Sequence, residues 1–183
     1  MQARASGGRR YRFFHVRASF LAGQGALMSM ASSLQEKYAP DSVCFGCGPR
    51  NEKGLRIRSF ARDDDVCVAR WRPQPHHLAF AGVVNGGICG ALLDCHSNWT
   101  AAWHLMRNAG TSVPPCTVTA QFAVQLKRPT PLDAELLLHA KVVSAAADRA
   151  TVDSAIEANG MVTATCRGVF VVVKEGHPAF HRW

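Results

Sequence analysis

The segment GVVNGGICGALLDCHSNWT, residues 82–100, holds the residues with the clearest capacity for chemistry. Within it, Asp94 is an acid in an otherwise apolar run, between Leu93 and a cysteine. Burying a carboxylate without a partner costs several kcal/mol, so this acid requires an explanation. One interpretation is a structural acid, bonded to an arginine or to Ser97 or Asn98. The other is a general base or nucleophile that lies in a cleft.

The residues just before this run offer a site for negative charge. Asn85 is a good N-cap, because its side-chain oxygen can accept a bond from the first free N–H groups of a helix. Gly86 and Gly87 leave the helix start uncovered by side chains, so a ligand can approach the backbone. Free N–H groups and the positive end of the helix dipole then favour a negative oxygen. A plain cap and tight packing of the glycines against a sheet remain the alternatives.

Apolar residues at helical spacing predict one long helix over residues 86–106. Leu93 and Leu105 add apolar side chains off the main stripe, which is typical of a buried helix. The segment RNAGTSVPP ends the helix with glycine and proline signals. His96 is close to Asp94 in sequence, but neighbouring helix positions point about 100° apart, so we expect no dyad between them.

Strand-like segments precede and follow this helix in the sequence. LRIRSF and VCVARWR precede it, and residues 117–127 alternate apolar and polar with a period of two. The segments AELLLHAKVVSA, ATVDSAIEA and MVTATCRGVFVVV follow, separated by hairpin-type connections. Consecutive hairpins give an antiparallel sheet. The predicted fold class is therefore α+β, with a curved, mainly antiparallel sheet wrapped around one long central helix.

Three motifs in order, CFGCGPRNEKGL, GVVNGGICGALLD and TVTAQFAVQLKRPT, resemble the hotdog-fold thioesterases. The branch is that of the phenylacetate-degradation and hydroxybenzoyl-CoA thioesterases, and the resemblance covers residues 44–173. Its most specific part is the small-residue helix start with an acid eight positions after the first glycine. The resemblance implies an acyl-CoA thioesterase that hydrolyses an acyl- or aryl-CoA to the free acid and coenzyme A. It also implies a homodimer with shared active sites, with a dimer of dimers as the larger alternative.

The resemblance assigns catalytic roles to Gly86, Asp94, Asn85 and Thr119. The Gly86 N–H polarises the thioester carbonyl, Asp94 drives the attack, and Thr119 matches a Ser or Thr beside the reactive water. An ordinary strand residue is the alternative for Thr119. So sparse a site suits a thioester, because a thiolate leaving group needs no dedicated general acid, so an oxyanion donor and a base suffice.

Five further residues form the predicted substrate-binding set. Lys127 and Arg128, at the end of a strand, are suited to the phosphates of coenzyme A, or are solvated charges before a turn. Gly87 lies at the open helix start, His77 in the loop before the helix, and Asn98 one turn beyond the acid. No metal and no separate cofactor is expected, since coenzyme A is part of the substrate.

The chain departs from the family pattern at one position, because Asn85 stands where the branch usually has a histidine. This change keeps alternatives open. A hotdog hydratase or dehydratase would want that histidine. A non-catalytic acyl-CoA-binding protein would need a partner domain, and a scaffold protein would need no catalytic residue at this position. A panel of acyl-CoA thioesters distinguishes them.

The basic charge of the chain belongs to its N-terminal segment. The net charge is +8, but five arginines lie before residue 30 and the first acid is Glu36, so the remainder carries 16 basic and 13 acidic residues, a net +3. With so little excess of basic residues, the domain lacks the basic face that nucleic-acid binding needs. We predict a leader over 1–35, a hotdog domain over 36–176 and a tail over 177–183. Translation from Met28 or Met30 and organellar targeting both remain open for the leader.

The chain has seven cysteines, an odd number, and they are scattered along the sequence. This pattern favours free thiols in a reducing cytoplasm over a framework of disulfide bonds. Cys44 and Cys47 form a lone CxxC motif without a second pair, and structural zinc wants four ligands. Cys89 and Cys95 are expected to be small core residues. No apolar run reaches about 18 residues, so no membrane span is expected.

Overall fold

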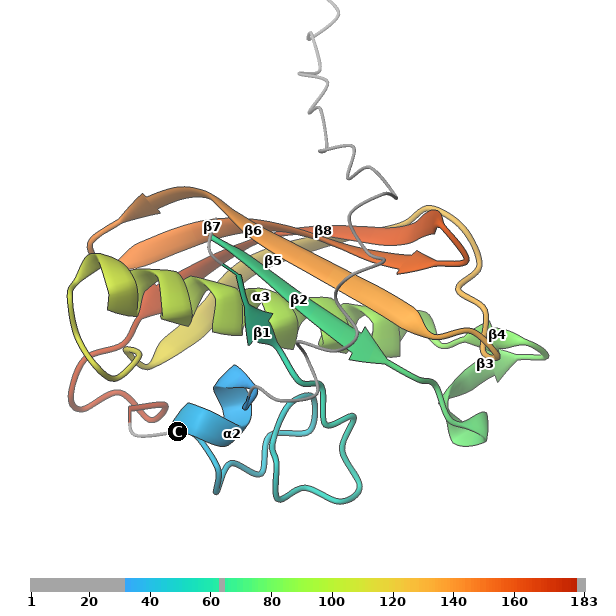
Figure 1. The fold of residues 1–183 in the computed structure, drawn as a ribbon, viewed down its shortest axis with the longest axis horizontal. Coiled ribbons are helices and arrows are strands. Elements are labelled where there is room, and N and C mark those ends of the chain that lie inside the picture. Colours follow the sequence, from blue (N-terminus) through green and yellow to red (C-terminus); the bar gives the residue numbers. More distant parts are fainter. Residues whose placement is uncertain (1–31, 63–64, 181–183) are drawn as a thin grey trace, which may run out of the picture.

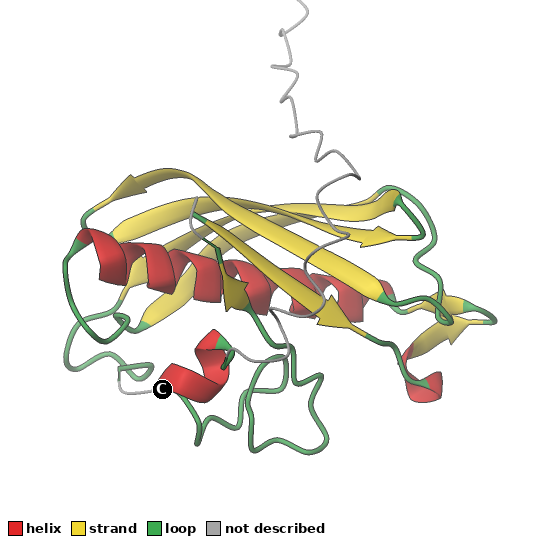
Figure 2. Cartoon of the chain, in the orientation of Figure 1, coloured by secondary structure: helices red, strands yellow, loops and turns green. Residues whose placement is uncertain are grey.

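One long helix, α3 (Gly86–Asn108), lies across one face of a six-stranded antiparallel sheet (Figure 1). The computed structural model describes residues 32–62 and 65–180. The sheet order is β1 (Phe60–Ala61), β2 (Val66–Trp71), β6 (Leu136–Ala146), β7 (Arg149–Ala158), β8 (Met161–Val172) and β5 (Thr117–Leu126). Figure 2 shows the strands of this sheet as one curved layer over the helix, with the small hairpin of residues 78–84 apart from it. The predicted architecture is confirmed, with the helix at nearly the predicted bounds.

The smaller elements lie around the helix. The short helix α2 (Leu34–Tyr38) packs below α3 in Figure 1. Before α3, the loop that we expected contains a short 3-10 helix, η2 (Pro75–His77), and a small hairpin of β3 (Leu78–Phe80) and β4 (Val83–Val84). The predicted hairpin at NG is present, since Asn159 and Gly160 have φ of 51° and 74°. Two successive positive φ angles are typical of the turn that matches strand twist.

The segment LRIRSF is not the strand that the sequence predicts. Only Phe60 belongs to a strand, and Arg56 has a φ of 51°, which interrupts an extended backbone. The segment is still part of the core, because Leu55 and Ile57 are buried. The indole of Trp71 donates to the carbonyl of Leu55 at 2.7 Å.

The strict alternation predicted for β5 is broken by a bulge. The pairing with β8 shifts register between Thr119 and Gln121. A bulge inserts one extra residue into the strand. Beyond it, even-numbered rather than odd-numbered side chains point to a given face of the sheet. Thr117 and Thr119 therefore face α3 on one side of the bulge, and Phe122 and Leu126 face it on the other.

A buried polar network joins α2, a loop and α3. His96 is fully buried, its Nε2 donates to the carbonyl of Cys67 at 3.2 Å, and its Nδ1 lies 2.8 Å from the Ser59 hydroxyl. Ser59 also accepts from the side chain of Gln35 at 3.0 Å. The folded domain thus includes residues 33–35, which the sequence assigns to the leader, and His96 points away from Asp94, as predicted.

This network makes stability depend on pH. Burial lowers the pKa of His96 to about 3, while an unfolded histidine titrates near 6.5. Between these values the unfolded chain binds a proton that the folded chain does not, so stability falls as pH falls. The expected slope is up to about 1.4 kcal/mol per pH unit. Urea unfolding at pH 7 and pH 5 measures it, and the variant His96→Gln should show a smaller fall; equal falls in both proteins would contradict this role.

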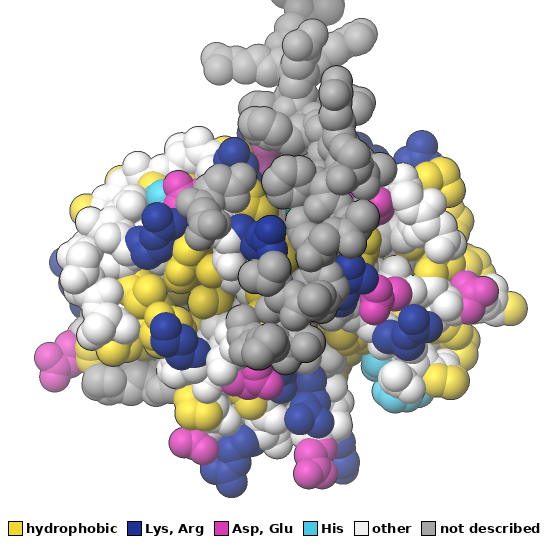
Figure 3. Space-filling view, viewed as in Figure 1, with side chains coloured by type: hydrophobic (Ala, Val, Ile, Leu, Met, Phe, Trp, Pro, Cys, Tyr) yellow, Lys and Arg dark blue, Asp and Glu magenta, His cyan; other side chains and the backbone are white. Residues whose placement is uncertain are grey.

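Charged side chains of both signs are interspersed on the face shown in Figure 3. No helix in the described part of the chain has the length and apolar content to cross a membrane. The predicted leader falls almost wholly outside the described residues. The predicted tail begins as a turn, with the N–H of Phe180 donating to the carbonyl of His177 at 2.8 Å.

Candidate active site

One face of α3 follows the bulged strand β5. The two elements lie side by side, and every fourth residue along this face of the helix lies against a residue of the strand. The pairs are Asn98 with Thr117, Asp94 with Thr119, Gly90 with Phe122, and Gly86 with Leu126. The helix thus carries two glycines, an acid and an amide along a single stripe. We call this set, Gly86, Gly90, Asp94 and Asn98, the β5-facing stripe.

Asp94 lies half-buried at the centre of this arrangement. The Thr119 hydroxyl donates to its Oδ1 at 2.7 Å, so the predicted pair of Asp94 and Thr119 is brought together. The Ser97 hydroxyl donates to Ser154, and the side-chain oxygen of Asn98 accepts from Thr117. A structural role for Asp94, with an arginine, Ser97 or Asn98 as its partner, stays the alternative. Burial raises the pKa of the Cys166 thiol to about 11, and the charge of the nearby Asp94 adds to this rise. The acid thus lies between β5 and β8.

The start of α3 has the predicted cap. The side-chain oxygen of Asn85 accepts from the N–H of Gly87 at 2.8 Å, and the backbone N–H of Asn85 donates to the carbonyl of His77 at 2.9 Å. Among the described residues, the N–H of Gly86 has no hydrogen-bond acceptor. A Cβ at Gly86 would approach Leu126 Cδ1 to 2.8 Å, so glycine also serves close packing here. The cap and the open N–H group are both present.

Removing the Asn85 side chain should lower the stability of the fold by about the contribution of its one hydrogen bond to the Gly87 N–H. We expect Asn85→Ala to lower the free energy of unfolding by about 1 kcal/mol, and Asn85→Asp to retain most of it. Urea unfolding of the three proteins measures the difference. Equal stability of the alanine variant and the wild type would show that the side chain does not stabilise the helix start.

The predicted substrate-binding residues lie in different settings. Lys127 and Arg128 are exposed beyond β5, where Lys127 contacts Gln125 and Arg128 donates to the carbonyl of Val162 at 3.0 Å. His77 is 8% exposed and stacks on Trp71 at 4.9 Å between ring centroids. Burial, and then the neighbouring His76, lower the pKa of His77. Asn98 is buried beside Thr117, so its contact to a ligand stays a prediction.

The sequence matches no family model, and it matches no curated protein. Solved structures do match. A thioesterase superfamily protein from Shewanella loihica is 27% identical, with a TM-score of 0.55, over 64% of this chain and 91% of its own. The PaaI protein from the phenylacetic acid degradation operon of E. coli is 18% identical, with a TM-score of 0.54, over 66% of this chain and 81% of its own.

The chain has the hotdog fold. Its curved antiparallel sheet around one long helix is shared with these structures, so the predicted fold is confirmed, and the structure that is 27% identical supports the resemblance to the thioesterase superfamily. A further matching structure, smu.793 from Streptococcus mutans bound to acetyl CoA, is 16% identical. The matched region covers 64% of this chain and 88% of the smu.793 chain, with a TM-score of 0.54.

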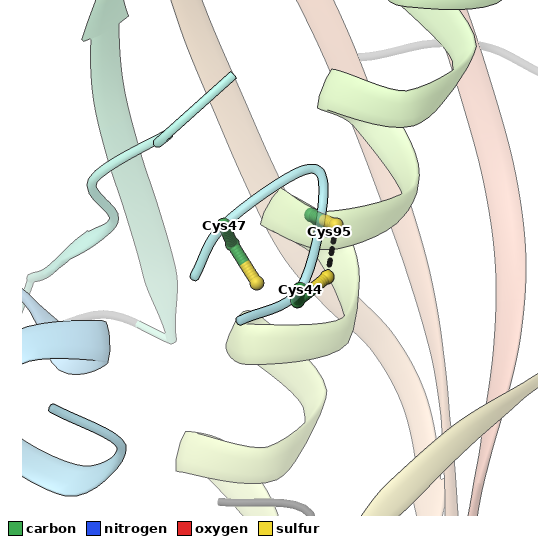
Figure 4. Close-up of side chains that lie close together, drawn as sticks. All are labelled: Cys44, Cys47 and Cys95. Atoms are coloured by element: carbon green, nitrogen blue, oxygen red, sulfur yellow. Dashed lines mark hydrogen bonds between the residues drawn. The ribbon is translucent and has the colours of Figure 1, made fainter. Parts of the chain in front are cut away.

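This hotdog domain contains a second cluster, of three thiols, that sequence reasoning missed in part. Cys44 and Cys47 come from the loop after α2, and Cys95 comes from α3; Figure 4 shows the three side chains pointing toward one another. The thiols of Cys47 and Cys95, and then nearby backbone N–H groups, lower the pKa of Cys44 well below its ordinary value. The Cys44 thiol in turn raises the pKa of Cys47 to about 11.

Proposed function

We propose that this hotdog protein is an acyl-CoA thioesterase that hydrolyses an acyl- or aryl-CoA to the free acid and coenzyme A. The observation that carries the proposal is the half-buried Asp94 carboxylate, held by the Thr119 hydroxyl at 2.7 Å on the central helix. The fold shared with thioesterase superfamily proteins, and with a protein bound to acetyl CoA, supports the substrate class.

One helix cannot readily supply both an acid and an oxyanion donor to one thioester. Gly86 and Asp94 are eight residues apart, which corresponds to about 12 Å along a helix at about 1.5 Å per residue. An oxyanion donor must come within about 3 Å of the carbonyl oxygen. The side chain of an aspartate reaches only a few ångströms, so the second group must come from elsewhere.

The free edge of the sheet indicates where a second copy would bind. β5, which is ten residues long, is the edge strand of the sheet. In the described part of the chain, no strand pairs with its outer edge. Phe122 and Leu126 on this strand are 47% and 59% exposed. A long edge strand with exposed apolar residues favours pairing with another chain. We therefore propose a homodimer in which two β5 strands pair antiparallel around a two-fold axis.

A pairing centred on Ala123 would complete both sites. Because the bulge near Ala120 absorbs one residue, Thr119 of one copy then lies opposite Leu126 of the other, on the same side of the sheet. Thr119 contacts Asp94, and Leu126 lies against Gly86. Asp94 of each copy would thus lie near Gly86 of the other, so that two shared sites form per dimer.

The chemistry of such a site balances without a cofactor. A water oxygen attacks the thioester carbonyl carbon while Asp94 accepts a proton from that water. The carbonyl oxygen becomes an oxyanion that faces the Gly86 N–H of the second copy and the positive end of its helix. The carbon–sulfur bond then breaks, and coenzyme A leaves as a thiolate. Direct attack by the Asp94 carboxylate, through an anhydride that water hydrolyses, is the variant mechanism.

A panel of CoA thioesters tests this function. Short-chain, medium-chain and aryl-CoA substrates are incubated with the protein, and the released thiol is measured with a chromogenic disulfide. We expect release of free coenzyme A from at least one class. Hydration of an enoyl-CoA without thiol release would identify a hydratase instead, and binding of every thioester without turnover would identify an acyl-CoA-binding protein.

A further inference from the structure

Three cysteines from distant parts of the sequence meet at the surface of α3. The sulfurs of Cys44 and Cys95 lie 3.9 Å apart, and the sulfurs of Cys44, Cys47 and Cys95 all lie within 4.8 Å of one another (Figure 4). Zinc bonds thiolate sulfur at about 2.3 Å in a tetrahedron, which places two such sulfurs about 3.8 Å apart. The cluster therefore needs only a small contraction to hold a zinc ion.

The loop that carries Cys44 and Cys47 is fixed in place by its own backbone. The N–H of Gly48 donates to the carbonyl of Cys44 at 2.8 Å, and the N–H of Ile57 donates to the carbonyl of Gly46 at 3.0 Å. A Cβ at Gly46 would lie 2.3 Å from the sulfur of Cys95, so glycine at this position lets the loop approach Cys95 closely. The loop thus lies directly against Cys95, and the three thiols are positioned before any ligand arrives.

The surroundings of the cluster suit a thiolate site that is open on one side. Cys47 is buried, and the indole N–H of Trp99 donates to its sulfur at 3.4 Å. Cys44 is exposed, so solvent reaches the cluster on that side. The guanidinium of Arg58 donates to the carbonyl of Cys47 at 3.3 Å and places a positive charge beside the loop. The same guanidinium is paired with the carboxylate of Glu36 at 3.3 Å.

We propose that Cys44, Cys47 and Cys95 bind one zinc ion, with water as the fourth ligand. Thiolates select soft cations such as zinc, whereas magnesium and calcium require oxygen ligands. Three protein ligands with one open position is a known zinc pattern. Binding replaces three S–H bonds by three S–Zn bonds, and the protons leave to solvent. The ion would tie the loop after α2 to the central helix, one residue from Asp94, whether or not the protein is a thioesterase.

Zinc titration of the full chain tests the site directly. The protein is reduced, freed of metal, and titrated with zinc against a chromogenic chelator, with magnesium as the negative control. We expect one zinc ion per chain. Cobalt in place of zinc should give the intense charge-transfer absorption of thiolate ligands. At a free zinc concentration 100 times the Kd, the melting temperature should rise by up to about 10 °C.

Single substitutions separate this site from nonspecific thiol binding. Cys44→Ser removes the exposed thiol and should weaken zinc binding by at least about 100-fold. Cys95→Ser should do the same, and circular dichroism confirms that both variants fold. Cys116→Ser is the matched control, because it removes a thiol outside the cluster, and it should bind zinc like the wild type. Equal affinity of the Cys44 and Cys116 variants, or no zinc binding by the reduced wild type, would overturn the proposal.

Discussion

Replacing Asp94 with asparagine should lower kcat by at least about 1,000-fold and leave folding and substrate binding nearly unchanged. General acid–base groups contribute roughly 100- to 10,000-fold, and an interaction needed mainly in the transition state is lost in kcat more than in KM. Asparagine has nearly the same shape, and its side-chain oxygen can still accept from the Thr119 hydroxyl, as Asp94 does at 2.7 Å. Steady-state kinetics on the best CoA thioester, together with thermal unfolding, measure both effects.

Asp153→Asn is the matched control for this loss of an acid. Asp153 lies on β7 and forms a two-pronged ion pair with Arg167 on β8. Its substitution should lower the melting temperature and leave kcat near the wild-type value, the opposite pattern to Asp94→Asn. Full activity in the Asp94 variant would remove the proposed mechanism.

Gly86→Pro should lower kcat by about 100- to 1,000-fold, the usual effect of losing one oxyanion-hole donor. Proline is tolerated at the first position of a helix, where it removes only the N–H. The preceding residue must then be extended, and Asn85 already has φ −59° and ψ 131°. The melting temperature should therefore change little. Kinetics and thermal unfolding of the purified variant measure the two quantities.

Gly86→Ala controls for the added side-chain bulk. Both substitutions introduce a Cβ that would approach Leu126 Cδ1 to 2.8 Å, but alanine keeps the N–H. Because Cδ1 is the far end of a flexible side chain, Leu126 can move aside. We expect the alanine variant to retain most of its activity. Equal losses in both variants would mean that packing, rather than the N–H group, matters at this position.

The sequence was sufficient for the helix, the hairpin strands and the cap because each follows from local pattern. Apolar spacing predicts α3, and NG predicts a turn in which both residues have positive φ, as Asn159 and Gly160 do. The strand expected at LRIRSF failed because Arg56 adopts a left-handed backbone, which no periodicity indicates.

Contacts between distant segments could be predicted only where the family resemblance indicated them. Thr119 was placed beside the reacting water by that resemblance, and the structure places it on Asp94. The bulge in β5 shifts the parity of the strand, so alternation alone assigns Phe122 and Leu126 correctly to the helix side but assigns Thr117 and Thr119 to the wrong face. The four-residue spacing of Gly86, Gly90, Asp94 and Asn98 was a usable signal in the sequence.

Cys95 shows the limit of reading one segment at a time. The sequence predicts a small core residue here, because a free cysteine usually behaves as a small apolar side chain. The structure brings it within 3.9 Å of Cys44, which lies 51 residues earlier in the chain. Only the packing of the loop after α2 on the helix creates this cluster.

The most direct test of the central claim, a thioesterase site shared by two copies, is to mix two inactive variants. Asp94→Asn and Gly86→Pro are dissociated, combined in equal amounts and reassembled, and mixed dimers are confirmed by mass spectrometry. Random reassembly makes about half of the dimers mixed, and each mixed dimer has one site with both lesions and one intact site. Activity should therefore rise from near zero to roughly a quarter of the wild-type value. A mixture that contains mixed dimers and remains inactive would contradict the shared site.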